Sequence, residues 1–182
     1  MTSFAYYVFS CETVYFAVIE VGVGGLLDGT NVVKNARKIS VLTRVGSDHQ
    51  AIVGDTITES AYQDCGIFNQ NSKVVCLYDP MTIDVYKHFS LIQNADLICV
   101  DPNDRLLIEF NYDKTVFKAN FLNFEIALGL KGKFQIENCL LSLKVVIECL
   151  KVCKIEVKDD KIPMVVTGSL YLLSMIYSIH QI

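Results

Sequence analysis

The sequence predicts an α/β fold with a mostly parallel sheet, a β-hairpin insertion, and a short strand and helix near the C-terminal end. Two observations predict this fold. Apolar runs of strand length alternate with helical patterns along the first part of the chain, and this alternation is typical of parallel sheets covered by helices. Between residues 106 and 128 the pattern changes to three short β-rich runs joined by polar turns, which indicates hairpins.

Each expected element has a local signal. Apolar residues at helical spacing predict a helix over 2–11, and an apolar run predicts a buried strand over 15–21. Thr56 and Glu59 form a capping-box pattern that predicts a helix from Thr56 to about Cys65, and Gly66 suits its C-terminus. The other expected elements are strands at 39–45, 73–78 and 97–100, helices at 81–94 and 135–151, and hairpin strands at 106–112, 116–119 and 123–128.

The C-terminal end is strongly apolar. After a charged linker at 154–161, residues 162–179 carry no charge. The length of this uncharged run reaches the lower limit for a membrane span. Pro163, Gly168 and several serines dilute this run, so we favour a buried strand at 164–167, a tight turn and a buried helix. A tail anchor in a membrane is the alternative.

Composition narrows the function classes. The chain has 182 residues, of which 52% are hydrophobic and 20% charged, and this favours a globular domain with a real core over disorder. A net charge of −4 without a basic stripe predicts no nucleic-acid partner. The seven scattered cysteines form no C-x-x-C pair, so we expect reduced structural thiols, with a metal site or disulfides as the alternative. Without a basic region ahead of the first apolar residues we expect no secretory signal, and a cytoplasmic protein.

A carboxylate followed by a glycine loop is the most informative motif. Glu20 ends the first apolar run, and His49 follows the second, at 39–45. Because neighbouring parallel strands end at the same sheet edge, Glu20 and His49 are expected to converge on a metal-ion site. The glycines allow the loop to approach a bound group closely. A dinucleotide loop does not match, since Leu27 stands where G-x-G-x-x-G requires glycine. A purely structural turn remains the alternative.

Taken in order, several segments resemble the folylpolyglutamate and dihydrofolate synthases of the Mur ligase superfamily. The stretch 20–31 is similar to the glycine loop of that family, and 48–57 to its next strand end with an Asp-His pair and a Gly-Asp-Thr-Ile motif. Residues 63–67 are similar to its Glu-Lys-Ala-Gly-Ile, and 132–138 to its Gly-x-x-Gln-x-x-Asn. Residues 165–171 are similar to the end of its C-terminal domain.

The resemblance implies an ATP-dependent ligase. ATP would phosphorylate a carboxylate of folate or dihydropteroate, and the amino group of L-glutamate would attack the acyl phosphate, with Mg²⁺ neutralising the phosphate charge. Carried over by resemblance, the metal ligands are Glu20, His49 and, more weakly, Asp64, which stands where the family has a lysine. Gln135 and Asn138 would lie near the nucleotide. The glycine-loop residues are Gly22, Gly24, Gly25, Asp28, Thr30 and Asn31.

The chain also departs from the family pattern. No Gly-x-x-x-x-Gly-Lys-Ser/Thr loop occurs in the 182 residues, and Leu26 replaces an arginine of the glycine loop. We therefore expect residues 1–151 to form an incomplete Mur-ligase-type central ATP-binding domain and 152–182 a remnant of the C-terminal ligase domain.

The isolated chain is accordingly expected to be inactive. Uncovered apolar surface predicts self-association or pairing with a complementing fragment. Two alternatives remain open: a non-catalytic module that binds folate, a nucleotide or a partner chain, and a tail-anchored membrane protein.

Overall fold

The computed structural model of the chain describes residues 1–14, 16–46, 54–110, 115–129 and 132–153. Their order of elements alternates between helix and strand, and then three strands follow one another before a last long helix. The predicted α/β architecture with a hairpin insertion is confirmed for these residues. The apolar segment 162–179 and its linker lie outside the described ranges.

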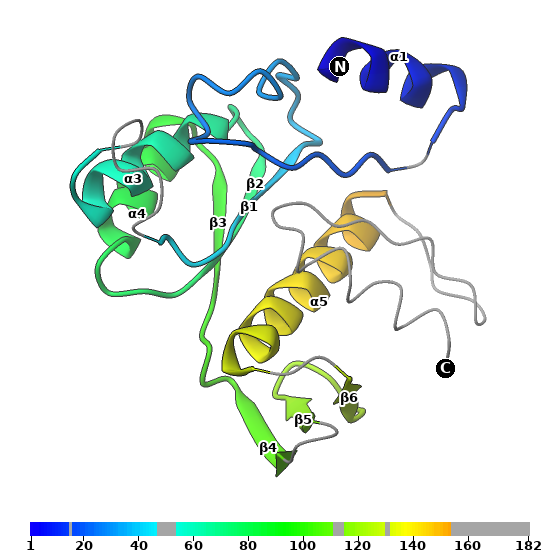
Figure 1. Cartoon of the computed structure of the whole chain (residues 1–182), viewed down its shortest axis with the longest axis vertical. Helices are drawn as coiled ribbons and strands as arrows, with labels where there is room; N and C mark the ends of the chain where they lie inside the picture. The colour runs from blue at the N-terminus through cyan, green and yellow to red at the C-terminus, as the bar shows by residue number, and fades with distance from the viewer. Residues whose placement is uncertain (15, 47–53, 111–114, 130–131, 154–182) are drawn as a thin grey trace.

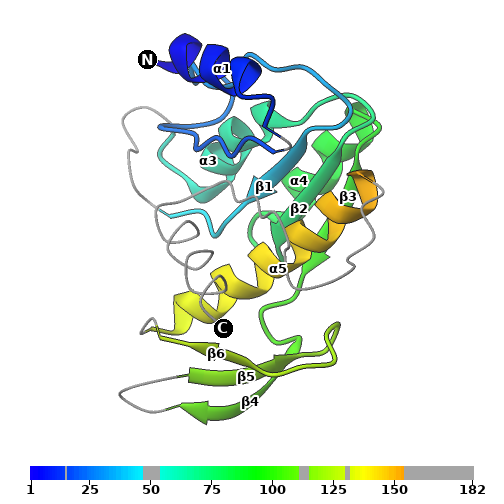
Figure 2. The ribbon, with the colours of Figure 1, turned by 90° about the vertical axis from the view of Figure 1, so that its right-hand side faces the viewer.

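A parallel sheet forms the centre of the larger part of the molecule. Its strands are β1 (Ile39–Leu42), β2 (Lys73–Leu77) and β3 (Asp96–Val100), in the order β1-β2-β3. Helices α3 (Ile57–Asp64) and α4 (Ile83–Ile92), with the short 3-10 turn η1 (Cys65–Ile67), cover one face. Helix α5 (Lys133–Cys153) covers the other face, as Figures 1 and 2 show.

The alternation of side chains along the strands divides the core into two clusters. Val41 and Val75 point to the face covered by α5, whereas Leu42, Val74 and Cys76 point to the face covered by α3 and α4. Because the middle strand is buried on both faces, its sequence reads as one apolar run. This explains why the sequence predicted β2 almost to the residue.

The three remaining strands form a separate antiparallel sheet. They are β4 (Arg105–Phe110), β5 (Thr115–Ala119) and β6 (Ile126–Leu128), and they lie at the bottom of Figure 2. Phe117 and Leu128 from this sheet belong to the same apolar cluster as Ile136 and Leu140 of α5. The long helix therefore contributes to the packing of both sheets.

Helix α1 (Thr2–Cys11) confirms the predicted helix but has no buried residue. Phe4 and Tyr7 remain 72% and 66% exposed. The Tyr6 hydroxyl donates a hydrogen bond of 2.8 Å to the carbonyl oxygen of Thr30, which ties the helix to the glycine loop. None of the helices in the described ranges combines the length and apolar character that crossing a bilayer requires.

Three local predictions need correction. The strand expected over 15–21 is wrong, because the described residues 16–21 have no strand pairing. A strand requires a hydrogen-bonded neighbour, and a cavity lies between this segment and β1. The strand expected over 39–45 ends at Leu42. Gly66 lies within η1 and does not end α3; the chain continues directly into a tighter turn.

The start of α3 agrees with the sequence. The Thr56 hydroxyl accepts a hydrogen bond of 3.2 Å from the Glu59 amide, and the Glu59 carboxylate accepts one of 3.0 Å from the Thr56 amide. These reciprocal bonds form the predicted capping box.

Candidate functional site

The glycine loop is organised around the carboxylate of Asp28. Its Oδ2 accepts hydrogen bonds from the amides of Gly22 and Val23, at 2.9 and 3.2 Å. Its Oδ1 accepts from the amide and the hydroxyl of Thr30, at 2.8 and 2.5 Å. Burial favours the protonated acid, but these four bonds outweigh it and lower the pKa of Asp28. Asp28 thus remains ionised and closes the loop on itself.

Asn31 fastens this loop to the end of α3. Its Nδ2 donates to the carbonyl oxygens of Gly25 and Gly66, at 3.0 and 2.9 Å. The amides of Gly25 and Leu26 in turn donate to the carbonyl of Gln63, at 3.0 and 2.8 Å. The loop and the α3–η1 junction are therefore held together by the Asn31 side chain and by backbone hydrogen bonds.

This approach is possible only because two glycines meet there. A Cβ built on Gly25 would lie 2.5 Å from Cγ2 of Ile67 and 2.6 Å from the carbonyl oxygen of Asp64. A Cβ on Gly66 would collide with the backbone of Leu26. Glycine at these two positions is therefore needed for close packing. This supports the alternative interpretation, in which the glycine loop is a structural turn.

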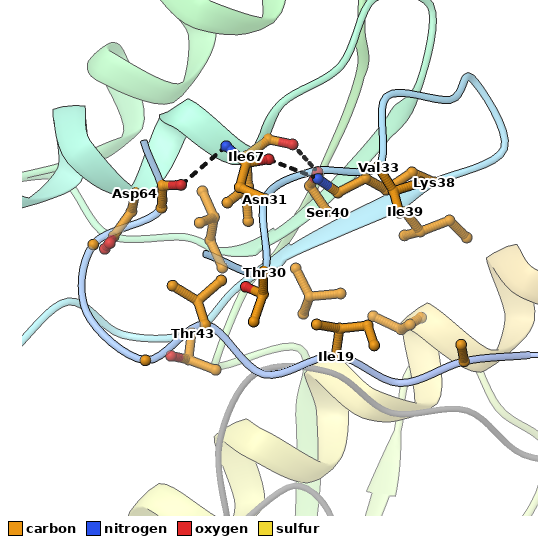
Figure 3. Close-up of a pocket in the computed structure, with 18 of the residues that line it drawn as sticks. Ile19, Thr30, Asn31, Val33, Lys38, Ile39, Ser40, Thr43, Asp64 and Ile67 are labelled. Carbon is orange, nitrogen blue, oxygen red and sulfur yellow. Dashed lines mark hydrogen bonds between the residues drawn. The ribbon is translucent and has the colours of Figure 1, made fainter. Parts of the chain in front are cut away.

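A cavity of about 690 Å³ opens between this loop and β1. Figure 3 shows that Ile19 and Thr30 line it on the N-terminal side. Ile39 of β1 and Thr43, the residue after β1, also line it. Asp64 lines it from the end of α3. Its volume is within the range of small-molecule sites, and its lining combines apolar residues with polar and charged ones.

Asp64 and Lys38 are among the ionisable groups of the cavity whose pKa values are perturbed. Burial raises the pKa of the Asp64 carboxyl to about 6. Burial, together with the neighbouring Lys34 ammonium, lowers the pKa of Lys38 to about 8. The Lys38 Nζ donates to Asn31 Oδ1 at 3.2 Å. Perturbed groups of both signs in one cavity are a feature of binding sites.

The sequence-predicted metal residues fall in different places. Asp64 lines the cavity, whereas Glu20 is exposed and lies between two lining residues, Ile19 and Val21. His49 lies outside the described residues. The expectation that Glu20 ends a strand is wrong, since the segment before it forms none. Among the described residues no group of three or more His, Cys, Asp or Glu side chains could hold a metal ion.

The residues expected near a nucleotide, Gln135 and Asn138, lie in the first turns of α5. Oε1 of Gln135 is buried and has no hydrogen-bond partner. A buried acceptor without a donor is costly, and a ligand that donates a hydrogen bond would relieve the cost. The backbone carbonyl of Asn138 accepts from the Ser142 hydroxyl at 2.5 Å, which is an intrahelical contact.

Sequence reasoning missed an ion-pair network next to the cavity. Arg44, which lines the cavity, contacts Asp79 at 3.1 Å and Glu137 at 3.0 Å. Arg44 follows β1, Asp79 follows β2 and Glu137 lies on α5, so the network joins three elements. The sequence signal is a charged residue two positions after the end of β1 and of β2, and this signal does not identify partners.

Comparison with known proteins places the chain in a family. No family model matches the sequence. The chain is 31% identical over 149 residues to the probable folylpolyglutamate synthase of Schizosaccharomyces pombe, a match that covers 81% of this chain and 26% of that protein. It is 36% identical over 162 residues to the mitochondrial folylpolyglutamate synthase of Cricetulus griseus, covering 88% of this chain and 24% of the relative.

The solved structures agree with these sequence matches. An FPGS–AMPPCP–folate complex superposes with a TM-score of 0.74 and 26% identity, covering 86% of this chain and 39% of that chain. The apo form of L. casei FPGS gives the same TM-score with 25% identity and the same coverage. The chain belongs to the folylpolyglutamate synthase and dihydrofolate synthase family.

The match to this synthase family is partial in length. The chain spans about a quarter of the length of the two folylpolyglutamate synthases just named. A probable dihydrofolate synthetase of Schizosaccharomyces pombe, 40% identical over 79 residues, matches 43% of this chain and 18% of that protein. Both synthase types are therefore represented among the relatives, and the comparison does not select one substrate.

Proposed function

We propose that this chain supplies part of an ATP-dependent ligase that adds L-glutamate to folate or dihydropteroate, and that it works in the cytoplasm. The observation that carries the proposal is the glycine loop closed by Asp28 and fastened by Asn31, beside a cavity lined by Asp64. The relatives named above and the AMPPCP and folate complexes of similar fold support the substrate class. Residues 1–151 would be its central domain, and 152–182 would belong to its C-terminal domain.

We assign nucleotide binding to the start of α5. Gln135 offers a buried, unpaired acceptor that fits an amino group of a nucleotide base. Titration calorimetry with AMPPCP is the test. Gln135→Ala should weaken binding about tenfold, the loss of one buried hydrogen bond, whereas the exposed Gln70→Ala should bind like the wild type. Equal affinities of all three proteins would reject the assignment.

We assign a Mg²⁺ contact to Asp64. Magnesium usually binds through one or two carboxylates and otherwise through water and substrate phosphates, so it needs no cluster of protein ligands. A half-buried carboxylate whose ionisation is disfavoured by burial fits such a cation. When bound, Mg²⁺ would neutralise charge on the phosphates. Glu20 and His49 remain proposed ligands by resemblance.

The Mg²⁺ contact can be tested by thermal unfolding with the nucleotide analogue present. Adding Mg²⁺ should raise the unfolding midpoint of the wild type and of Asp84→Asn, whose carboxylate is 88% exposed on α4. It should have little effect on Asp64→Asn. An equal gain in Asp64→Asn would show that the cation binds elsewhere.

Catalysis by these 182 residues alone is not expected. Phosphoryl transfer requires backbone amides and a lysine around the β- and γ-phosphates, and the sequence contains no Gly-x-x-x-x-Gly-Lys-Ser/Thr loop. The purified polypeptide should release no ADP in a glutamate-dependent manner with dihydropteroate or tetrahydrofolate. Measurable turnover would show that another segment supplies the phosphate cradle.

The partner of this chain would be a complementing polypeptide segment. Within the described residues β1 is one of the two edge strands of its sheet, and the cavity separates it from the mainly apolar segment 16–21. An added strand in this position would cover both β1 and the segment 16–21. Size-exclusion chromatography with light scattering tests this: association or poor solubility is expected, and a monodisperse monomer with a cooperative thermal transition would refute it.

A further inference from the structure

Two cysteines lie side by side on neighbouring parallel strands. Cys76 of β2 and Cys99 of β3 are paired in register, so their Cα atoms stand opposite each other. Their sulfur atoms are 3.6 Å apart, within the contact distance of a weak thiol hydrogen bond. Because the two residues are register partners, their side chains leave the same face of the sheet.

The two thiols differ sharply in access to solvent. Cys99 is exposed, since β3 is the outer strand of the described sheet. Cys76 is fully buried against α3 and α4. An oxidant in solution can therefore reach Cys99 directly but not Cys76. Redox-sensor cysteines are often accessible to solvent and lie next to a resolving cysteine, and Cys99 is accessible and lies next to Cys76.

The backbone geometry allows the two sulfurs to bond. Neighbouring strands lie about 4.8 Å apart, and disulfides form across Cα separations of about 4.4–6.8 Å. Only a side-chain rotation is then needed to bring the sulfurs from 3.6 Å to the bonding distance. The strands themselves can keep their register.

We propose that Cys76 and Cys99 form an oxidation-sensitive dithiol that closes to a disulfide in response to a peroxide. The peroxide first oxidises the Cys99 thiol to a sulfenic acid and is itself reduced, with one water released. The Cys76 sulfur then attacks the sulfenic sulfur, the S–S bond forms, the S–O bond breaks, and the hydroxyl leaves with the Cys76 proton as a second water. A thiol reductant of the glutathione class reverses the bond by exchange.

The disulfide would cross-link β2 to the outer strand β3. The chain segment that it closes into a loop contains α4. Cys76 lies three residues before Asp79, which pairs with Arg44 at the cavity. The cross-link would stabilise the folded protein, since a disulfide removes freedom mainly from the unfolded chain. The oxidised protein should therefore unfold at a higher temperature than the reduced protein.

The test exposes the whole chain to a small excess of hydrogen peroxide and then blocks free thiols. Intact-mass measurement should show the loss of two hydrogens, and peptide mapping should join the Cys76 peptide to the Cys99 peptide. In Cys76→Ala the reaction should stop at a sulfenic acid on Cys99 that a dimedone probe captures. Cys99→Ser lacks one of the two sulfurs and should form no disulfide with Cys76. Cys11→Ser removes another exposed thiol and should behave like the wild type.

Two results would overturn the proposal. One is persistent dimedone labelling of Cys99 in the wild type without any cross-link. The other is a cross-link that joins other cysteines while Cys76 and Cys99 remain free. Circular dichroism of each variant confirms the native fold, and Cys99→Ser, a change at an exposed position, keeps the test decisive if Cys76→Ala is destabilised.

Discussion

Adding one methyl group at Gly25 should destabilise the protein substantially. The new Cβ of Gly25→Ala would lie 2.5 Å from Cγ2 of Ile67, 2.6 Å from the Asp64 carbonyl oxygen and 3.2 Å from that of Gln63. Unstrained carbon contacts begin near 3.5 Å, so the loop must move by about 1 Å. Two of the three obstacles are backbone atoms and cannot rotate away.

The size of the effect follows from what this movement disturbs. Overpacking in a tight site costs about 1–3 kcal/mol. The shift also strains the hydrogen bonds from the Gly25 and Leu26 amides to Gln63, each contributing about 1 kcal/mol. We expect a loss of about 3 kcal/mol, which corresponds to a fall in Tm of about 6–12 °C for a chain of this length.

Urea unfolding followed by far-UV circular dichroism measures this loss. Gly29→Ala is the matched control, because a Cβ there meets nothing within 4 Å and the residue has no positive φ. Its stability should stay within about 0.5 kcal/mol of the wild type. If Gly25→Ala unfolds at the same urea concentration as Gly29→Ala, the close packing of the glycine loop on α3 is wrong.

Three further substitutions test the site and the core by the same urea unfolding. Asn31→Ala should cost about 2 kcal/mol, because two carbonyls lose their donor, while Asn123→Ala, at an exposed position, should cost little; equal effects would contradict the role of Asn31. Glu148→Gln should cost about 2 kcal/mol, because the Glu148 side chain is 4% exposed and pairs with two lysines. The control Asp96→Asn, at a carboxylate 62% exposed, should change little. Burial opposes ionisation of Glu148, but its lysine hydrogen bonds outweigh burial and lower its pKa, so the advantage of the wild type over Glu148→Gln should shrink as the pH falls below the ordinary value of 4.5. A gap that does not change with pH would refute this. Asp64 has the opposite sign: burial raises its folded pKa from 3.8 to about 6, so the unfolded chain releases the proton first and stability from this group falls as the pH rises through that interval. Relative to Asp64→Asn, the wild type should lose about 1 kcal/mol between pH 4 and pH 6, after allowing for partial solvent exposure, and parallel curves would exclude the shift.

Several elements were predictable because their signals are local. The capping box at Thr56 and Glu59, the buried strand β2 and the long helix α5 each depend on residues close together in sequence. The glycine loop was also visible, since glycines followed by Asp28 and Thr30 form a short-range hydrogen-bonded turn. These signals require no knowledge of a partner segment.

Other features depend on distant residues and were missed or misplaced. The segment 16–21 has the composition of a buried strand, but a strand exists only when a neighbour pairs with it, and a cavity lies on its β1 side. Gly66 was assigned to a helix end, whereas its role is to let the Leu26 backbone approach from a loop far away in sequence.

Residues close together in the chain were sufficient to predict most helices and strands, the family and the glycine loop, because hydrophobic periodicity, capping and turn chemistry act over a few residues; the segment 16–21, which has no strand pairing, is the exception. Which groups lie together became known from the folded arrangement: Asp64 lines the cavity, Arg44 pairs with Asp79, and Cys76 lies beside Cys99. Such contacts depend on strand order and register, and a single sequence does not encode them in any local pattern.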